Sequence, residues 1–202
     1  MPKQPWDYHE DLSLDRLQLL AKVLRDTRRD AIALHDPAAG DTSWSLGCRV
    51  YARSTEMLSR TADDLWPWLV VVQSSLEFVF RIGVVPLRFF HGDASRPDAQ
   101  HLKVADAEAR QLGFAFGDAS ADLVWRIVVE TNAAGEAEDI VLIGSTSERD
   151  VECQFVIPRL DDSVSFFEPL KPESSRGVEL PSPIVTPRRQ KQIKDEDGGS
   201  EV

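Results

Sequence analysis

Residues 66–92, WPWLVVVQSSLEFVFRIGVVPLRFFHG, form the longest apolar run of the chain and decide its fold class. Across residues 76–82, apolar residues alternate with Glu77 and Arg81, which is the period of a strand with one buried face. A second alternation covers residues 85–90. We therefore predict two or three neighbouring strands that begin a sheet. The residues expected on the buried face are Leu76, Phe78, Phe80 and Ile82.

Two helices are predicted before this run. The first is capped by Ser13, shows leucines at helical spacing and ends near residues 35–36. The second covers about residues 44–62, with Ser43 as its cap. Its expected buried face consists of Trp44, Cys48, Tyr51, Thr55, Leu58 and Ala62. The basic residues expected mostly off the first helix's apolar stripe are Lys22, Arg25, Arg28 and Arg29.

The second half of the chain predicts one helix and three strands. The helix covers residues 105–116, and alternating apolar residues predict strands near 123–130, 140–143 and 151–157. Short turns between these strands favour an antiparallel meander. The expected fold is α+β, with an N-terminal helical hairpin packed on an antiparallel sheet of about five to six strands and one crossover helix.

Composition divides the chain into three segments. Residues 1–12 form an N-terminal arm, which Trp6 and Tyr8 either pin onto the domain or leave as a loose arm. Residues 13–160 are expected to form a single α+β domain. Residues 161–202 are rich in proline and charge, so we expect a disordered tail.

The formal net charge of −11 narrows the classes of partner that we expect for this protein. Such a chain is repelled by nucleic-acid phosphates and anionic lipid, so we expect a protein partner and no membrane. The exception is a basic cluster in the tail, which could contact nucleic acid or an acidic partner. Because acidic residues 195–197 follow it directly, we favour a solvated cluster that binds neither. The cluster consists of Arg188, Arg189, Lys191 and Lys194.

The cysteines and histidines predict no metal site and no cofactor. Cys48 and Cys153 have no CxxC neighbour, and the four histidines lie at no metal-ligand spacing to them. Two free, buried thiols in a reducing compartment are therefore expected. Residues 1–11 contain no apolar signal segment, and charges interrupt the longest apolar run. These features predict a cytoplasmic protein.

The loop that follows the apolar run carries the first candidate site. His91 would act as a general base oriented by Asp93, with His101 close by. The alternative is a turn at Gly92 and Asp93 with both histidines solvated. We favour the turn, because no nucleophile motif accompanies these residues.

Three arginines carry the second candidate site. Arg81, Arg88 and Arg126 occupy off-face positions of predicted strands, and neighbouring strands would bring them together. Guanidinium groups match phosphate or carboxylate, so the group could bind a small anion or a nucleotide. The favoured alternative is a cross-strand ion-pair ladder with Glu77 and Glu130 on a solvated face.

Three functional hypotheses remain open at this point. The leading one is a non-catalytic protein-interaction or regulatory module with an acidic surface, such as an adaptor or an antitoxin- or immunity-like protein. The others are a small hydrolase or nuclease centred on His91 and Asp93, and an anion sensor using the arginine face. The chain has no glycine-rich phosphate loop, GxSxG or HExxH motif, which favours a protein that is not an enzyme. The sequence gives no indication of oligomeric state.

Overall fold

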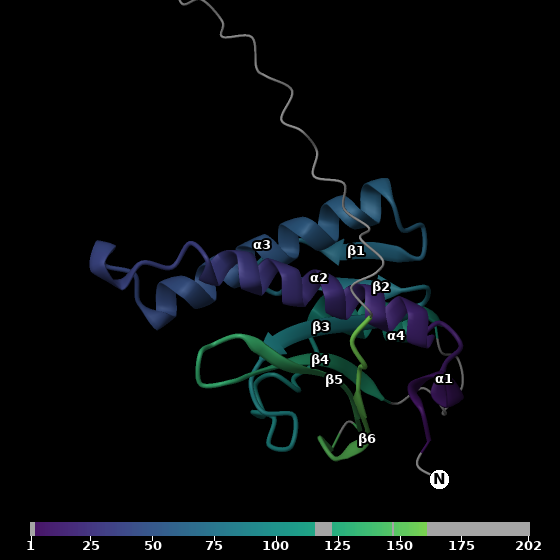
Figure 1. Cartoon of the computed structure of the whole chain (residues 1–202). Coiled ribbons are helices and arrows are strands. Elements are labelled where there is room, and N and C mark those ends of the chain that lie inside the picture. Colours follow the sequence, from purple (N-terminus) through teal and green to yellow (C-terminus); the bar gives the residue numbers. More distant parts are fainter. Residues whose placement is uncertain (1–2, 116–122, 147, 161–202) are drawn as a thin grey trace, which may run out of the picture. The chain divides into compact units, whose positions relative to one another are not determined.

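The computed structural model describes residues 3–115, 123–146 and 148–160, and for residues 111–115 it describes the backbone alone. Two long helices, α2 (Leu14–Ile32) and α3 (Ser43–Asp64), precede the sheet and lie side by side (Figure 1). A short 3-10 turn, η1 (Pro37–Ala39), joins them. The predicted α+β fold with an N-terminal helical hairpin is confirmed. The predicted disordered tail lies outside the described residues.

Six strands form one sheet in the order in which they occur in the chain. Their bounds are β1 Leu69–Gln73, β2 Val79–Ile82, β3 Val85–His91, β4 Val124–Thr131, β5 Ala137–Ser145 and β6 Val151–Val156. Neighbouring strands are antiparallel except β3 and β4, which are parallel. The helix α4 (Asp106–Ala115) lies in the connection between these two, because a parallel pair needs a crossover. The predicted meander is confirmed for β4 to β6.

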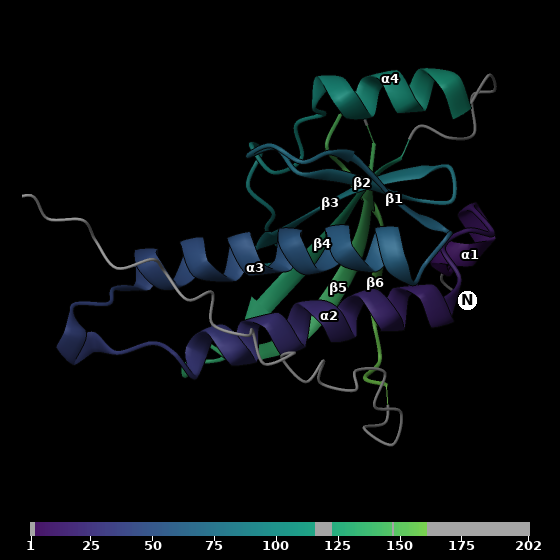
Figure 2. The same ribbon diagram turned by 90° about the horizontal axis from the view of Figure 1, so that it is seen from above.

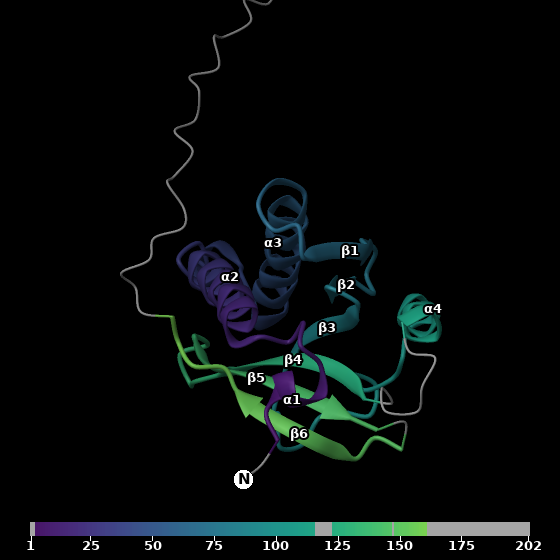
Figure 3. The ribbon, with the colours of Figure 1, turned by 90° about the vertical axis from the view of Figure 1, so that its right-hand side faces the viewer.

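Both faces of the sheet are covered. Figure 2 shows the α2–α3 pair and α4 on opposite sides of the strands, and Figure 3 shows β1 next to α3. Phe80 faces the helical pair, while Val79 packs against Ala105 and Ala107 on the α4 side. The prediction of a solvated face opposite Phe80 is therefore wrong. The crossover helix and the segment before it exclude water from that face.

The N-terminal arm is pinned onto the sheet by aromatic contacts. Its short helix, α1 (Pro5–Tyr8), places the ring of Trp6 5.4 Å from that of Phe155. The ring of Tyr8 lies 5.7 Å from that of Trp125. Both contacts are edge-on, which is a favoured arrangement of aromatic pairs. Of the two alternatives for the arm, the structure shows the pinned one.

A carboxylate ties the end of this arm to the turn between β2 and β3. Asp11 accepts hydrogen bonds from the N–H of Val84 at 3.0 Å and from Arg16 at 2.6 Å. Burial raises the pKa of Asp11, but these two donors and the nearby positive charge outweigh it and lower the pKa. Gly83 has φ +56°, and a Cβ there would clash with the Asp11 carboxylate. Glycine is thus required at this close approach.

Two of the predicted buried faces include terminal residues that the structure shows to be exposed. Leu76 is 90% exposed, because it lies in the turn before β2 rather than in the strand. Phe78, Phe80 and Ile82 are buried as predicted. In α3, Trp44 and Cys48 are exposed, because the first turns of this helix border an open pocket at the ends of β3 and β4 and bury no residue.

The helix boundaries differ slightly from the prediction. The first helix ends at Ile32. The second is capped by Thr42 rather than Ser43, and Thr42 and Ser45 form a reciprocal capping box with distances of 2.9 and 3.2 Å. In the part of the chain that the structure describes, no helix has the length and apolar character needed to cross a membrane.

Candidate functional site

His91 lies at the end of β3, next to the end of the parallel strand β4. Parallel strands end at the same edge of a sheet, so His91 meets Thr131, and Nε2 lies 2.9 Å from the Thr131 hydroxyl. Burial lowers the pKa of His91, and the positive charges of Arg28 and His101 lower it further. The His91 side chain nevertheless remains exposed, and the lowered pKa favours its neutral form relative to a free histidine.

The structure does not join His91 to Asp93. The Asp93 carboxylate accepts the N–H of Ser95 at 2.7 Å. The backbone carbonyl of Asp93 accepts the N–H of Arg96, and the two bonds close a turn. Within the described residues, Asp93 makes no hydrogen bond or ion pair with His91. His101 is occupied too, because its ring stacks on Phe90 with centroids 4.2 Å apart. The geometry matches the turn rather than an oriented general base.

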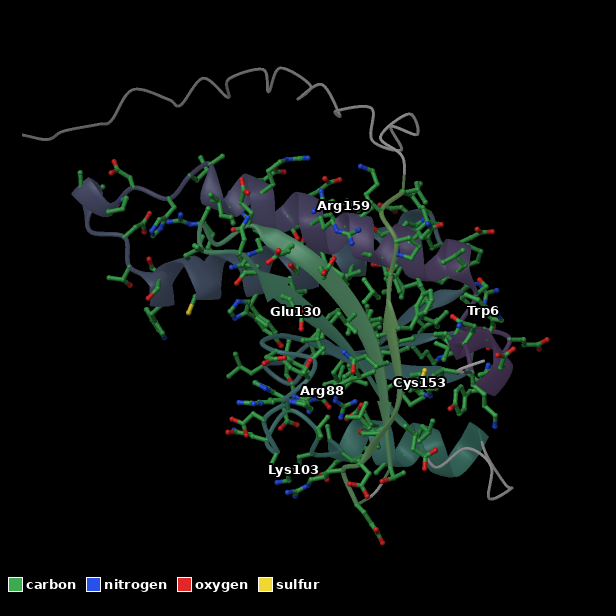
Figure 4. The ribbon with its side chains drawn as sticks, turned by 60° about the horizontal axis from the view of Figure 1, so that its bottom comes forward. Trp6, Arg88, Lys103, Glu130, Cys153 and Arg159 are labelled. Carbon is green, nitrogen blue, oxygen red and sulfur yellow. The ribbon has the colours of Figure 1, made fainter. Side chains whose placement is uncertain are left out.

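The three arginines share a sheet face, but only two of them meet. Arg88 and Arg126 are opposite each other in the pairing of β3 with β4. Arg81 lies one strand further out and donates to the carbonyl of Gly83. Figure 4 shows Arg88 and Lys103 on the same side of the sheet, where Nη1 of Arg88 donates to the Lys103 carbonyl at 3.3 Å.

Arg126 is 0% exposed and its guanidinium group is fully used. Two of its nitrogens donate to the Glu108 carboxylate, one at 3.0 Å. The remaining hydrogen bonds go to the carbonyls of His101, Lys103 and Trp125. Burial lowers the pKa of Arg126, and the Glu108 charge opposes that effect. A saturated arginine of this kind has no donor left for an anion.

The partner of Arg126 is Glu108, which differs from the predicted ladder. Neither Glu77 nor Glu130 forms an ion pair with the arginines in the described structure, and Glu130 instead accepts the N–H of Ala94 at 2.7 Å. Glu108 is the third residue of α4 and also accepts the N–H of Ala105 at 2.9 Å. One carboxylate thus caps the crossover helix and holds it to β4.

A pocket of about 330 Å³ opens between α2, α3 and the ends of β3 and β4. Most of its lining is apolar, and no aspartate or glutamate lines it. Two basic residues line the pocket, His91 from β3 and Arg28 from α2. Arg28 is only 7% exposed. Burial lowers its pKa.

The outer end of the helical hairpin, residues 33–48, carries exposed apolar side chains. Trp44 is 77% exposed and Leu34 is 56% exposed. No residue of α3 before Ser54 is buried. Figures 1 and 2 show this end extending beyond the strands.

Asp41 orders the hairpin end. Its carboxylate accepts the N–H of Asp36 at 3.0 Å and bonds Arg49 and Ser45. Those donors, the Asp36 N–H first, hold the pKa of Asp41 at about 2. Trp44 therefore stands on a hairpin end whose loop is tied together by a charged side chain.

Sequence reasoning missed Arg28 and Glu108, although both left a signal. Arg28 comes four residues after Leu24 and three before Ala31, so it lies on the apolar stripe of α2 rather than off it. Glu108 comes three residues after Ala105, on the face predicted to be apolar. A charged residue on a buried stripe needs a partner or a ligand. A search for charges at apolar-stripe positions would therefore have identified both residues.

The remaining predicted groups are placed as follows. Cys153 is buried, which raises the pKa of its thiol, and the exposure of Cys48 contradicts the prediction of two buried thiols. Within the described ranges, no three His, Cys, Asp or Glu side chains gather as metal ligands would. The tail cluster of four basic residues lies outside the described residues.

Comparison of the chain with protein-family models, with curated proteins and with solved structures found no match in any of the three.

Proposed function

We propose that this protein is a non-catalytic interaction module whose contact surface is the hairpin end. The observation that carries the proposal is Trp44, which is 77% exposed although it lies in the first turn of a well-capped helix. Tryptophan is enriched among residues that dominate protein–protein binding energy. An apolar side chain of this size gains most by being buried against a partner.

The surroundings of Trp44 support this proposal. The first turns of α3 have no buried residue, and short helical segments are only marginally stable in water unless they pack against another surface. Leu34 adds a second exposed apolar group at the same end of the hairpin. The Asp41 carboxylate links Asp36 and Arg49 across this end, and such cross-links reduce the ordering entropy that is lost when a partner binds.

The hydrolase or nuclease hypothesis has less support. His91 is bonded to Thr131, and the carboxylate of Asp93 is bonded to Ser95. A general base needs a substrate proton within reach and a group that orients the ring, and Asp93 does not supply the second. Both cysteines are free in the described structure, which fits our proposal that the module acts in the cytoplasm.

Quantitative affinity capture tests the proposal with three baits. They are the wild type, Trp44→Ser, and Leu76→Ser as a control that removes another exposed apolar side chain far along the chain. We expect at least one captured protein to lose about tenfold or more of its affinity for Trp44→Ser, as hot-spot residues do, and to keep it for Leu76→Ser. The purified pair then gives the two dissociation constants. Equal affinity of every captured protein for all three baits would contradict the proposal, provided that the variants melt like the wild type.

A further inference from the structure

We propose that the pocket between α2, α3 and the ends of β3 and β4 binds a small organic anion, with its acidic group on Arg28 and its apolar body among the helices. Three residues of the hairpin end, Ser43, Leu46 and Gly47, also line this pocket, but the ligand class differs and the argument rests on Arg28 rather than on Trp44. It also moves the anion-binding hypothesis from the arginines of the sheet to an arginine of α2.

Arg28 has hydrogen-bond donors that no described residue uses. Its side chain is more than nine-tenths buried and lines the pocket. Nε donates to the carbonyl of Gly135, and neither Nη atom donates to any described residue. No carboxylate in the described part of the chain lies within ion-pair distance of Arg28. Neither Nη atom is among the fully buried atoms without a partner, so the guanidinium group reaches the open pocket. A largely desolvated positive charge without a counter-charge is costly, and a bound anion would supply that charge.

The charge of the pocket lining also favours an anion. The chain carries 34 acidic residues, yet none of those described lines this pocket. Arg28 and His91 are the titratable basic groups there, and their charges are close enough to influence each other. Ser43 adds a hydroxyl-bearing residue to the same lining, while the Thr131 hydroxyl is already hydrogen-bonded to His91. A negative ligand would thus meet donors and no competing carboxylate.

The size and polarity of the pocket favour an organic anion over an inorganic one. A volume of about 330 Å³ lies at the lower end of the range for small-molecule sites. Leu24, Leu46 and Val129 supply apolar walls. An inorganic ion would leave most of this apolar surface in contact with water. A carboxylate or phosphate ester that carries one aromatic or branched apolar group fits both parts of the lining.

A matched pair of fluorescent probes separates the charge from the apolar body. One probe is 8-anilinonaphthalene-1-sulfonate, and the other is N-phenyl-1-naphthylamine, which has the same ring system without the sulfonate. The variant is Arg28→Met in the full chain. The control is Arg29→Met, which removes the same charge from the next residue of α2, where the side chain is exposed and pairs with Asp26.

The two probes should respond differently to these substitutions. We expect Arg28→Met to weaken sulfonate binding by about tenfold or more, since it removes a charge-assisted hydrogen-bond donor, and to leave the neutral probe within about twofold. Arg29→Met should change neither. Equal sulfonate affinity of wild type and Arg28→Met, or equal weakening by the two substitutions, would overturn the proposal.

A second variant tests the location of the probes without removing the charge. Gly47 lines the pocket from α3, and a Cβ added there would meet no atom within 4 Å. Gly47→Leu should therefore fill space in the pocket and weaken both probes, while the helix is kept. Unchanged binding of both probes to Gly47→Leu would show that they bind elsewhere and would overturn the proposal.

Competition identifies the acidic group of the ligand. Phenylacetate and phenyl phosphate both place an anion on a single ring that the pocket can hold. Displacement of the sulfonate probe by either compound supports the proposal, and the stronger competitor identifies the head group. Displacement by neither compound at millimolar concentration would overturn it.

Discussion

Arg28 and Arg126 are buried on opposite sides of the same sheet, and their surroundings differ in one respect. Arg126 has a carboxylate, Glu108, and three backbone carbonyls around its guanidinium group. Arg28 has one carbonyl, that of Gly135, and faces a pocket. Burial alone therefore does not separate a structural arginine from one that is available to a ligand. The partners of the guanidinium group separate the two.

The largest loss of stability is expected at Arg126, whose guanidinium group has a full set of partners. Glu108→Gln leaves Arg126 buried without its counter-charge, and breaking a buried pair in this way costs about 3–5 kcal/mol of unfolding free energy. Denaturant unfolding measures the cost. The matched control is Glu56→Gln, which breaks an exposed ion pair with Arg60 in α3 and should cost under about 0.5 kcal/mol. Similar costs for the two variants would show that the Arg126 pair is not the anchor of α4.

A smaller change in stability is expected when Arg28 is replaced. Arg28→Met removes one hydrogen bond to Gly135, but it also removes a buried charge that has no described carboxylate partner. These contributions oppose each other, so we expect the free energy of unfolding to change by less than about 1.5 kcal/mol. The same denaturant series measures it. A loss as large as that of Glu108→Gln would mean that Arg28 is a structural residue like Arg126.

The smallest effect is a dependence of stability on pH. Because burial and the charges of Arg28 and His101 lower the pKa of His91, the unfolded chain takes up this proton near pH 6.5, before the folded protein does. The stabilising contribution of neutral His91 is thus present above pH 6.5 and is lost as the pH falls through the lower pKa of the folded state.

Two variants check that dependence. His91→Gln should remove this part of the acid destabilisation, which is followed by thermal melting from pH 7.5 to pH 5. Arg28→Met should raise the pKa of His91 toward its ordinary value, as followed by NMR titration of the imidazole. A His91 pKa that does not move in Arg28→Met would show that the two groups are not neighbours in solution.

The sequence predicted those parts of the fold that rest on repeated local patterns. The leucines of α2 and the alternation in β2, β4 and β6 each recur over several residues, so one misplaced residue does not obscure them. The ends of elements were harder to predict. Leu76 continues the alternation of β2 but lies in a turn, and Trp44 continues the stripe of α3 but lies beyond the sheet. Periodicity indicates which residues share a face, but it does not indicate how far the surface beneath them extends.

The candidate sites depended on long-range pairing that local patterns do not report. The partner of Arg126 comes from α4, and the partner of His91 comes from β4 through a parallel pairing that follows a crossover. His91 and Asp93 are two residues apart, and such closeness in sequence suggested a pair that the turn geometry does not make. Arg28 was recognisable as a charge on an apolar stripe, but its missing counter-charge becomes visible only once the helices are packed on the sheet.

Arginine side-chain NMR during titration with phenylacetate tests the contrast between the two arginines most directly. Signals of the Arg28 and Arg126 guanidinium groups are assigned by comparison with Arg28→Met and Arg126→Lys. We predict that the Arg28 signal shifts in a saturable way as phenylacetate is added, while the Arg126 signal stays in place and exchanges its protons slowly. An Arg28 signal that does not respond, or an Arg126 signal that shifts equally, would contradict this account.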